Sequence, residues 1–97
     1  GPRVLLISPV TIRENAVPEG PFFTHDESLR FAGLYEAVAQ ASGVHFLDAA
    51  RYAQPSPKEG THLLPEGHAA LARAVAEQVR TIFAQEELEA KTGHAAL

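Results

Sequence analysis

Two short apolar runs, one on each side of a helical pattern, constrain the fold of this chain more than any other feature. The first run, residues 4–7 (Val-Leu-Leu-Ile), stops at Ser8-Pro9 and predicts a strand buried on both faces, as in a parallel sheet. The second run, residues 44–48 (Val-His-Phe-Leu-Asp), predicts another strand. The segment 9–23 holds three prolines and a glycine, so we expect a loop there.

The residues between the two runs carry signals for the start and the end of a helix. Thr24 and Glu27 have the spacing of a capping box, in which each residue satisfies a backbone N–H of the other. Apolar residues then recur at helical spacing from Phe31 onward, and Gly43 suits the left-handed position that ends many helices. We therefore predict a helix over 26–42 and a strand–helix–strand unit with parallel strands.

A second, longer helix is predicted after the polar segment 49–64. Pro65 suits the first helical turn, and Glu66 lies where the helix dipole favours a negative charge. The pattern weakens from Glu86, so residues 86–97 are expected to be a helix extension or a frayed tail. The apolar stripe of this helix consists of Leu71, Val75, Val79, Ile82 and Phe83.

Two strands and two helices in the order β-α-β-α are too few to bury their own apolar surface. A chain of 97 residues is small, and an exposed edge of a parallel sheet invites pairing with another chain. We therefore expect a truncated parallel α/β sheet that is completed by oligomerisation, most simply as a homodimer, or by packing against a missing N-terminal half. The apolar stripe of the second helix is the expected interface.

Composition excludes several classes of function. The net charge is −4 and there is no basic run, so neither nucleic acid nor an anionic membrane surface is an expected partner. The chain has no cysteine, which excludes a disulfide framework, a thiolate metal site and a cysteine nucleophile. Its apolar runs are too short to span a bilayer and no signal peptide opens it, so we expect a soluble protein of unassigned compartment.

Methionine is also absent, and the chain begins with Gly1-Pro2, a dipeptide that tag-cleaving proteases commonly leave. We therefore expect residues 1–2 to be a tag remnant and residues 3–85 to form a single α/β domain.

The segment 59–68 (Glu-Gly-Thr-His-Leu-Leu-Pro-Glu-Gly-His) holds the densest group of chemically active side chains. It resembles the last conserved block of the SGNH (GDSL-like) hydrolases, in which a D-x-x-H motif precedes a helix. The stretches 4–9 and 43–48 are similar to the late strands of that fold. The resemblance covers nearly the whole chain but only the C-terminal half of the family, and it implies a truncated flavodoxin-like α/β sheet.

The resemblance implies an ester hydrolase without a cofactor that acts on a small-molecule ester. His62 matches the general base that activates a serine, and Glu59 matches the carboxylate that orients it and stabilises the imidazolium. Glu59 stands where the family has Asp. Other catalytic triads use Glu in this role, so the longer side chain is compatible with it. The family's Gly-Asp-Ser nucleophile block and its oxyanion-hole Gly and Asn blocks are absent from these residues. The acyl-enzyme mechanism therefore needs a nucleophile from outside them.

Two alternatives remain open from the sequence. Imidazole and carboxylate are zinc ligands, so His25, Asp26, Glu59 and His62 are a candidate set for a zinc-dependent hydrolase of esters or phosphoesters within a homodimer. The other alternative is an inactive fragment or association module. In that case His62 and Glu59 are ordinary loop residues, and Asp26 only interacts with a helix dipole.

Overall fold

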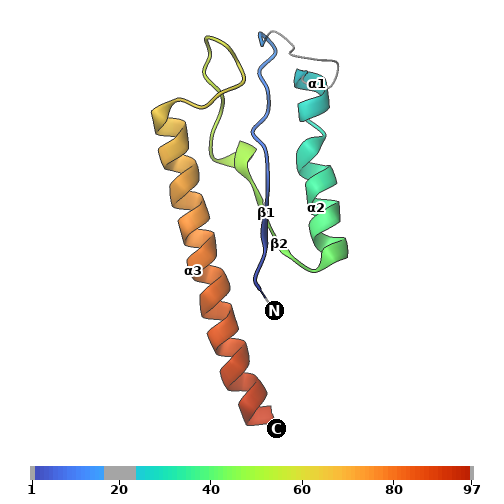
Figure 1. Ribbon diagram of the computed structural model, residues 1–97, viewed down its shortest axis with the longest axis vertical. Coiled ribbons are helices and arrows are strands. Elements are labelled where there is room, and N and C mark those ends of the chain that lie inside the picture. Colours follow the sequence, from blue (N-terminus) through green and yellow to red (C-terminus); the bar gives the residue numbers. More distant parts are fainter. Residues whose placement is uncertain (1, 17–23, 97) are drawn as a thin grey trace.

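The computed structural model describes residues 2–16 and 24–96, with side chains as far as residue 92. The two strands form a parallel sheet, with α2 along one side of it and α3 along the other (Figure 1). The predicted order of strand, helix, strand and helix is confirmed, and so is the α/β class. The elements are β1 (Leu5–Ser8), α1 (His25–Ser28), α2 (Phe31–Ser42), β2 (His45–Asp48), the short 3-10 helix η1 (Ala49–Arg51) and α3 (Pro65–Ala96).

The register of the sheet brings the carboxyl ends of both strands to one level. Leu5 pairs with His45, and Ser8 pairs with Asp48. The hydroxyl of Ser8 donates to Asp48 Oδ1 at 3.2 Å, and the same oxygen accepts the amide of Ala50 at 2.9 Å, which caps η1. The segments that follow β1 and β2 therefore leave the sheet next to each other at the carboxyl ends of the strands, where sites in parallel α/β sheets are usually built.

The predicted single helix over 26–42 is wrong in one respect, because it is broken between α1 and α2. Thr24 caps α1 by accepting the amide of Glu27 at 3.2 Å, as the capping box predicts. The hydroxyl of Ser28 then donates to the carbonyl of His25 at 2.7 Å and accepts the amide of Ile12 at 2.9 Å. A serine that bonds the backbone in this way competes with the regular helical ladder. The helix restarts at Phe31 and ends at a left-handed Gly43 (φ 67°), as predicted.

The prediction that the first strand is buried on both faces is also wrong. Val4 and Ile7 are exposed, Leu5 and Leu6 are half-buried, and Ser8 is completely buried. In the described residues β2 is the only strand paired with β1, so the other edge of β1 has no neighbour. The buried apolar residues are few, and three of them are alanines: Ile12, Ala39, Leu47, Ala49, Ala53, Pro55 and Ile82.

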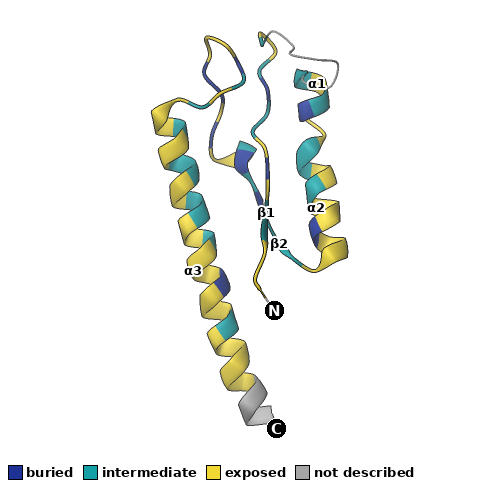
Figure 2. Ribbon diagram, in the orientation of Figure 1, coloured by how far each residue is buried: buried dark blue, intermediate teal, exposed yellow. Residues whose placement is uncertain are grey.

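Helix α3 begins at Pro65 as predicted and is helical as far as Ala96, so the tail is a helix extension. The carbonyl of Leu64 accepts the amides of Gly67 and His68 at 2.9 and 3.0 Å, which closes the first turn. The predicted apolar stripe divides in two. The side of α3 that faces the sheet is half-buried or buried (Figure 2). Leu71 and Val75 are half-buried and Ile82 is buried, while Val79 and Phe83 remain 37% and 55% exposed.

The chain is elongated and exposes an unusually large surface. Its radius of gyration is 16.8 Å, whereas a compact domain of this length has about 12.5 Å. Its accessible surface is 7000 Å², whereas a compact monomer of this mass exposes roughly 5400 Å². The shortage of burial inferred from the sequence is therefore real, although self-association stays a prediction. No described helix combines the length and the apolar character needed to cross a membrane.

Candidate active site

The two predicted site residues lie on a closed turn between η1 and α3. Residues 55 and 63 form an isolated antiparallel bridge at the base of the turn. The amide of Ser56 donates to the carbonyl of His62 at 2.7 Å, and the amide of Gly60 donates to the carbonyl of Ser56 at 2.8 Å. Backbone bonds therefore tie the turn to itself. The two prolines in the segment indicate a loop in the sequence but give no sign of this closure.

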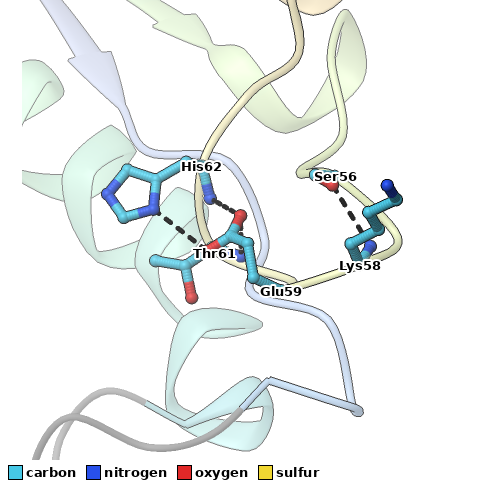
Figure 3. Close-up of polar contacts among 5 residues, drawn as sticks. All are labelled: Ser56, Lys58, Glu59, Thr61 and His62. Atoms are coloured by element: carbon cyan, nitrogen blue, oxygen red, sulfur yellow. Dashed lines mark hydrogen bonds and ion pairs between the residues drawn. The ribbon is translucent and has the colours of Figure 1, made fainter.

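Glu59 and His62 contact each other directly on this turn. Glu59 Oε1 accepts the amides of Thr61 at 3.1 Å and His62 at 2.5 Å, and Oε2 lies 3.0 Å from His62 Nδ1 (Figure 3). The imidazole ring extends away from Ser56 and Lys58 in this view, with its Nδ1 edge turned towards Glu59. An Nδ1–H that donates to Glu59 places the lone pair of the neutral ring on Nε2, on the opposite edge.

The charge state of Glu59 supports this arrangement. The hydrogen bond from the His62 side chain is the main cause that lowers the pKa of the Glu59 carboxyl below its usual 4.5, followed by the hydrogen bond from the His62 amide. Both side chains are largely open to solvent, with exposed fractions of 46% for Glu59 and 79% for His62. Glu59 is therefore ionised at neutral pH and can accept a bond from Nδ1–H.

We expect the substitution His62→Ala to raise the pKa of the Glu59 carboxyl towards 4.5, because it removes the largest cause of the lowering and keeps the backbone bonds. An NMR titration of the Glu59 carboxyl carbon measures this. A lowered pKa makes the carboxylate stabilising above the unfolded-state pKa, and that stability is lost as the pH falls through the folded-state pKa. The Glu59→Gln variant should thus be less stable than wild type at neutral pH and equal to it in acid. A Glu59 pKa unchanged by His62→Ala would contradict the contact.

His25 and Asp26, the other members of the predicted zinc set, belong to a different part of the fold. His25 Nδ1 lies 2.6 Å from the carbonyl of Ile12, and Nε2 lies 3.6 Å from Glu14 Oε1. Asp26 is in the first turn of α1. No three His, Asp or Glu side chains form a group that could hold a metal ion among the described residues. A single chain therefore does not assemble the zinc set.

The serines do not supply a nucleophile beside His62. Ser8 and Ser28 are buried, and their hydroxyls donate to Asp48 and to the carbonyl of His25, respectively. Ser56 is also buried, and its hydroxyl accepts the amide of Lys58 at 3.1 Å (Figure 3). Ser42 is the last residue of α2, and this end of the helix lies at the opposite end of the strand–helix unit from the turn (Figure 1). This placement agrees with the absence of a Gly-Asp-Ser sequence.

Sequence reasoning missed the residues that hold the turn in place, which lie in the loop after β1. The amide of Arg13 donates to the carbonyl of Gly60 at 2.9 Å, and Asn15 Nδ2 donates to the carbonyl of Pro57 at 2.8 Å. These residues have no periodicity or motif that could reveal contacts more than forty positions along the chain. The one signal in the sequence is Gly60 itself, a glycine inside the motif, whose φ of 79° few other residues tolerate.

Solved structures with a similar fold include several esterases. The chain matches a candidate arylesterase from Agrobacterium tumefaciens with 36% identity and a TM-score of 0.66, over 80% of this chain and 37% of that one. It matches the M. smegmatis aryl esterase with 28% identity and a TM-score of 0.69, over 82% and 39%. A carbohydrate acetylesterase from Sinorhizobium meliloti gives 26% identity and a TM-score of 0.70, over 84% and 39%.

The chain thus spans about two fifths of the length of the solved structures that it matches. No family model matches it, and no curated protein is significantly similar to it in sequence. The chain is similar to these esterases both in sequence, with identities of 26–36%, and in backbone structure, with TM-scores of 0.66–0.70. The resemblance that the D-x-x-H-like segment predicts is therefore confirmed.

Proposed function

Since the chain has the fold of the SGNH-type esterases, we propose that it carries the general-base part of the active site of an ester hydrolase. One observation supports the proposal above all others, namely the 3.0 Å contact between Glu59 Oε2 and His62 Nδ1. It gives the imidazole a defined tautomer with Nε2 directed away from the carboxylate. An exposed Nε2 is what a base needs to reach a hydroxyl group.

In the proposed mechanism, His62 Nε2 removes the proton from a serine hydroxyl as the serine oxygen attacks the carbonyl carbon of the ester. The tetrahedral intermediate collapses when His62 returns that proton to the leaving alcohol, which leaves an acyl-serine. A water molecule, deprotonated by the same nitrogen, then attacks the acyl carbon, and the acid leaves as the bond to serine breaks and His62 returns the proton to the serine oxygen. Glu59 stabilises the imidazolium in both steps through Nδ1–H. No step involves a cofactor.

The serine and the oxyanion donors come from a segment outside these 97 residues in this proposal. The uncovered side of β1 is a suitable surface for that segment, because an added parallel strand would satisfy the open edge. The apolar side chains Leu34 and Val38 of α2 lie beside Leu6 there, around a hollow of about 240 Å³. Burying such side chains is worth about 25 cal/mol for each Å² removed from water.

The expected substrates are small carboxylic esters with short acyl groups. The names of the matched structures, an aryl esterase and a carbohydrate acetylesterase, support this class without fixing the alcohol. Phenyl acetate and an acetylated sugar are therefore the first two substrates to compare.

A hybrid enzyme tests the proposal. The matching segment of the M. smegmatis aryl esterase is replaced with residues 3–85 of this chain, and hydrolysis of 4-nitrophenyl acetate is measured. We expect a folded hybrid to hydrolyse the ester with burst kinetics, the signature of an acyl-enzyme. The isolated 97-residue chain, which contributes only the base, should show no burst.

The matched control is the same hybrid with Glu59→Ala and His62→Ala together, whose thermal melting is compared with that of the parent hybrid. A hybrid that melts cooperatively yet hydrolyses the ester no faster than this control would refute the proposal. It would favour an inactive association module instead.

A further inference from the structure

The loop after β1 joins α1 to the turn that carries Glu59 and His62. On one side, both backbone groups of Ile12 are bonded to α1. Its amide donates to Ser28 Oγ at 2.9 Å, and its carbonyl lies 2.6 Å from His25 Nδ1. Ile12 itself is 8% exposed, so its side chain is part of the small core. The residues that follow Ile12 therefore start from a fixed anchor.

On the other side, Arg13 bonds the turn at two positions, one at its base and one in its interior. Its amide donates to the carbonyl of Gly60 at 2.9 Å, next to Glu59. Its Nε donates to the carbonyl of Pro55 at 2.6 Å, in the residue that pairs with Leu63 at the base of the turn. Hydrogen bonds from a charged donor are stronger than neutral ones, and a guanidinium fixes the direction of approach.

Asn15 adds a third connection, since its Nδ2 donates to the carbonyl of Pro57 at 2.8 Å. The turn is thus bonded from the same loop at positions 55, 57 and 60. Gly60 also packs closely on this loop, because a Cβ at position 60 would lie 3.1 Å from Arg13 Cβ. Glu59 lies between the bonded positions 57 and 60. Among the described residues, its own main chain makes no hydrogen bond to a residue outside the turn, so these neighbouring bonds set its position.

We propose that Arg13, assisted by Asn15, is a positioning residue that holds the Glu59 carboxylate against His62 Nδ1 and so selects the imidazole tautomer with Nε2 unprotonated. This inference rests on the proposed function and names a residue that acts on the dyad without touching substrate. A shift of Glu59 by about 1 Å relative to His62 within the turn would lengthen the Glu59–His62 bond beyond hydrogen-bond range. The tautomer would then no longer be fixed.

The ¹⁵N chemical shifts of the His62 imidazole test the inference, because they distinguish the two neutral tautomers. They are measured on the 97-residue chain at a pH where the imidazole is neutral. In wild type we expect the proton mainly on Nδ1. In Arg13→Ala the ratio of Nδ1-protonated to Nε2-protonated ring should fall about fivefold, the effect of losing one net hydrogen bond.

Two further variants separate positioning from folding. Asn15→Ala removes one bond at an exposed position, so it should shift the ratio in the same direction by a smaller factor with unchanged melting. The control is Arg30→Ala, which removes an exposed arginine whose ion pair among the described residues is with Glu27, at 3.7 Å, and should leave the ratio unchanged.

The outcomes distinguish this inference from the proposed function. A wild-type ratio that is retained in both Arg13→Ala and Asn15→Ala overturns the positioning role and leaves the dyad intact. A wild-type chain in which the proton is mainly on Nε2 contradicts the dyad itself and with it the proposed function. A shift in Arg30→Ala as large as that in Arg13→Ala also overturns the inference, because it would show a general effect of losing charge.

Discussion

The substitution His62→Ala should lower kcat for ester hydrolysis in the hybrid enzyme on the order of 10⁴- to 10⁶-fold. Without the imidazole, the serine must lose its proton to water, and the leaving alcohol has no acid to protonate it. The Michaelis constant should change little, because His62 contacts the reacting hydroxyl rather than the bulk of the substrate. Stopped-flow measurements of the burst and the steady state separate the two constants.

His68→Ala is the matched control for this experiment. His68 is exposed in the first turn of α3, six positions from His62, and contributes only its amide to the helix start. Its removal should leave kcat within about twofold of the hybrid, as for most exposed surface substitutions. Equal losses in the two variants, or a loss below about tenfold for His62→Ala, would remove His62 from the mechanism.

The substitution Gly60→Ala should destabilise the chain by about 3 kcal/mol, through left-handed backbone strain and steric overlap. Gly60 is buried with a φ of 79°, and an added Cβ would lie 2.9 Å from Ala16 Cβ and 3.1 Å from Ala16 Cα. Because part of the overlap is with backbone, a change of rotamer cannot relieve it. Thermal melting should shift downward by roughly 10–20 °C for a domain of this size.

The substitution Gly33→Ala makes the same chemical change but should stabilise the chain rather than destabilise it. Gly33 is exposed within α2, and an added Cβ there has no atom within 4 Å. Alanine is a better helix former than glycine by about 1 kcal/mol, so melting should rise by several degrees. If both variants melt at the same temperature, the close packing of Gly60 on the loop after β1 is wrong.

Much of the fold can be predicted from local signals. The apolar runs locate both strands to within one residue, Thr24 and Gly43 mark helix ends, and Pro65 begins α3. These signals are reliable because each reflects a backbone group that must be satisfied within a few residues. The Glu59–His62 contact is also predictable locally, because three residues of spacing in a turn bring the two side chains together.

The remaining features depend on contacts between distant parts of the chain. The helix breaks after Ser28 because its hydroxyl bonds a loop sixteen positions earlier, which no helical periodicity records. The expected burial of Ile7 fails because nothing covers the open edge of β1 among the described residues. The role of Arg13 is hidden likewise, because its partner Pro55 is forty-two positions away.

The length of α3 has a practical consequence for handling the protein. The helix has 32 residues, and those described from 87 to 92 are all exposed. From Pro65 to Glu87 the helix rises by about 33 Å, so its far end is remote from the turn. A dye, a biotin or an immobilisation linker attached near residue 90 would therefore leave the imidazole facing the medium, away from the solid support.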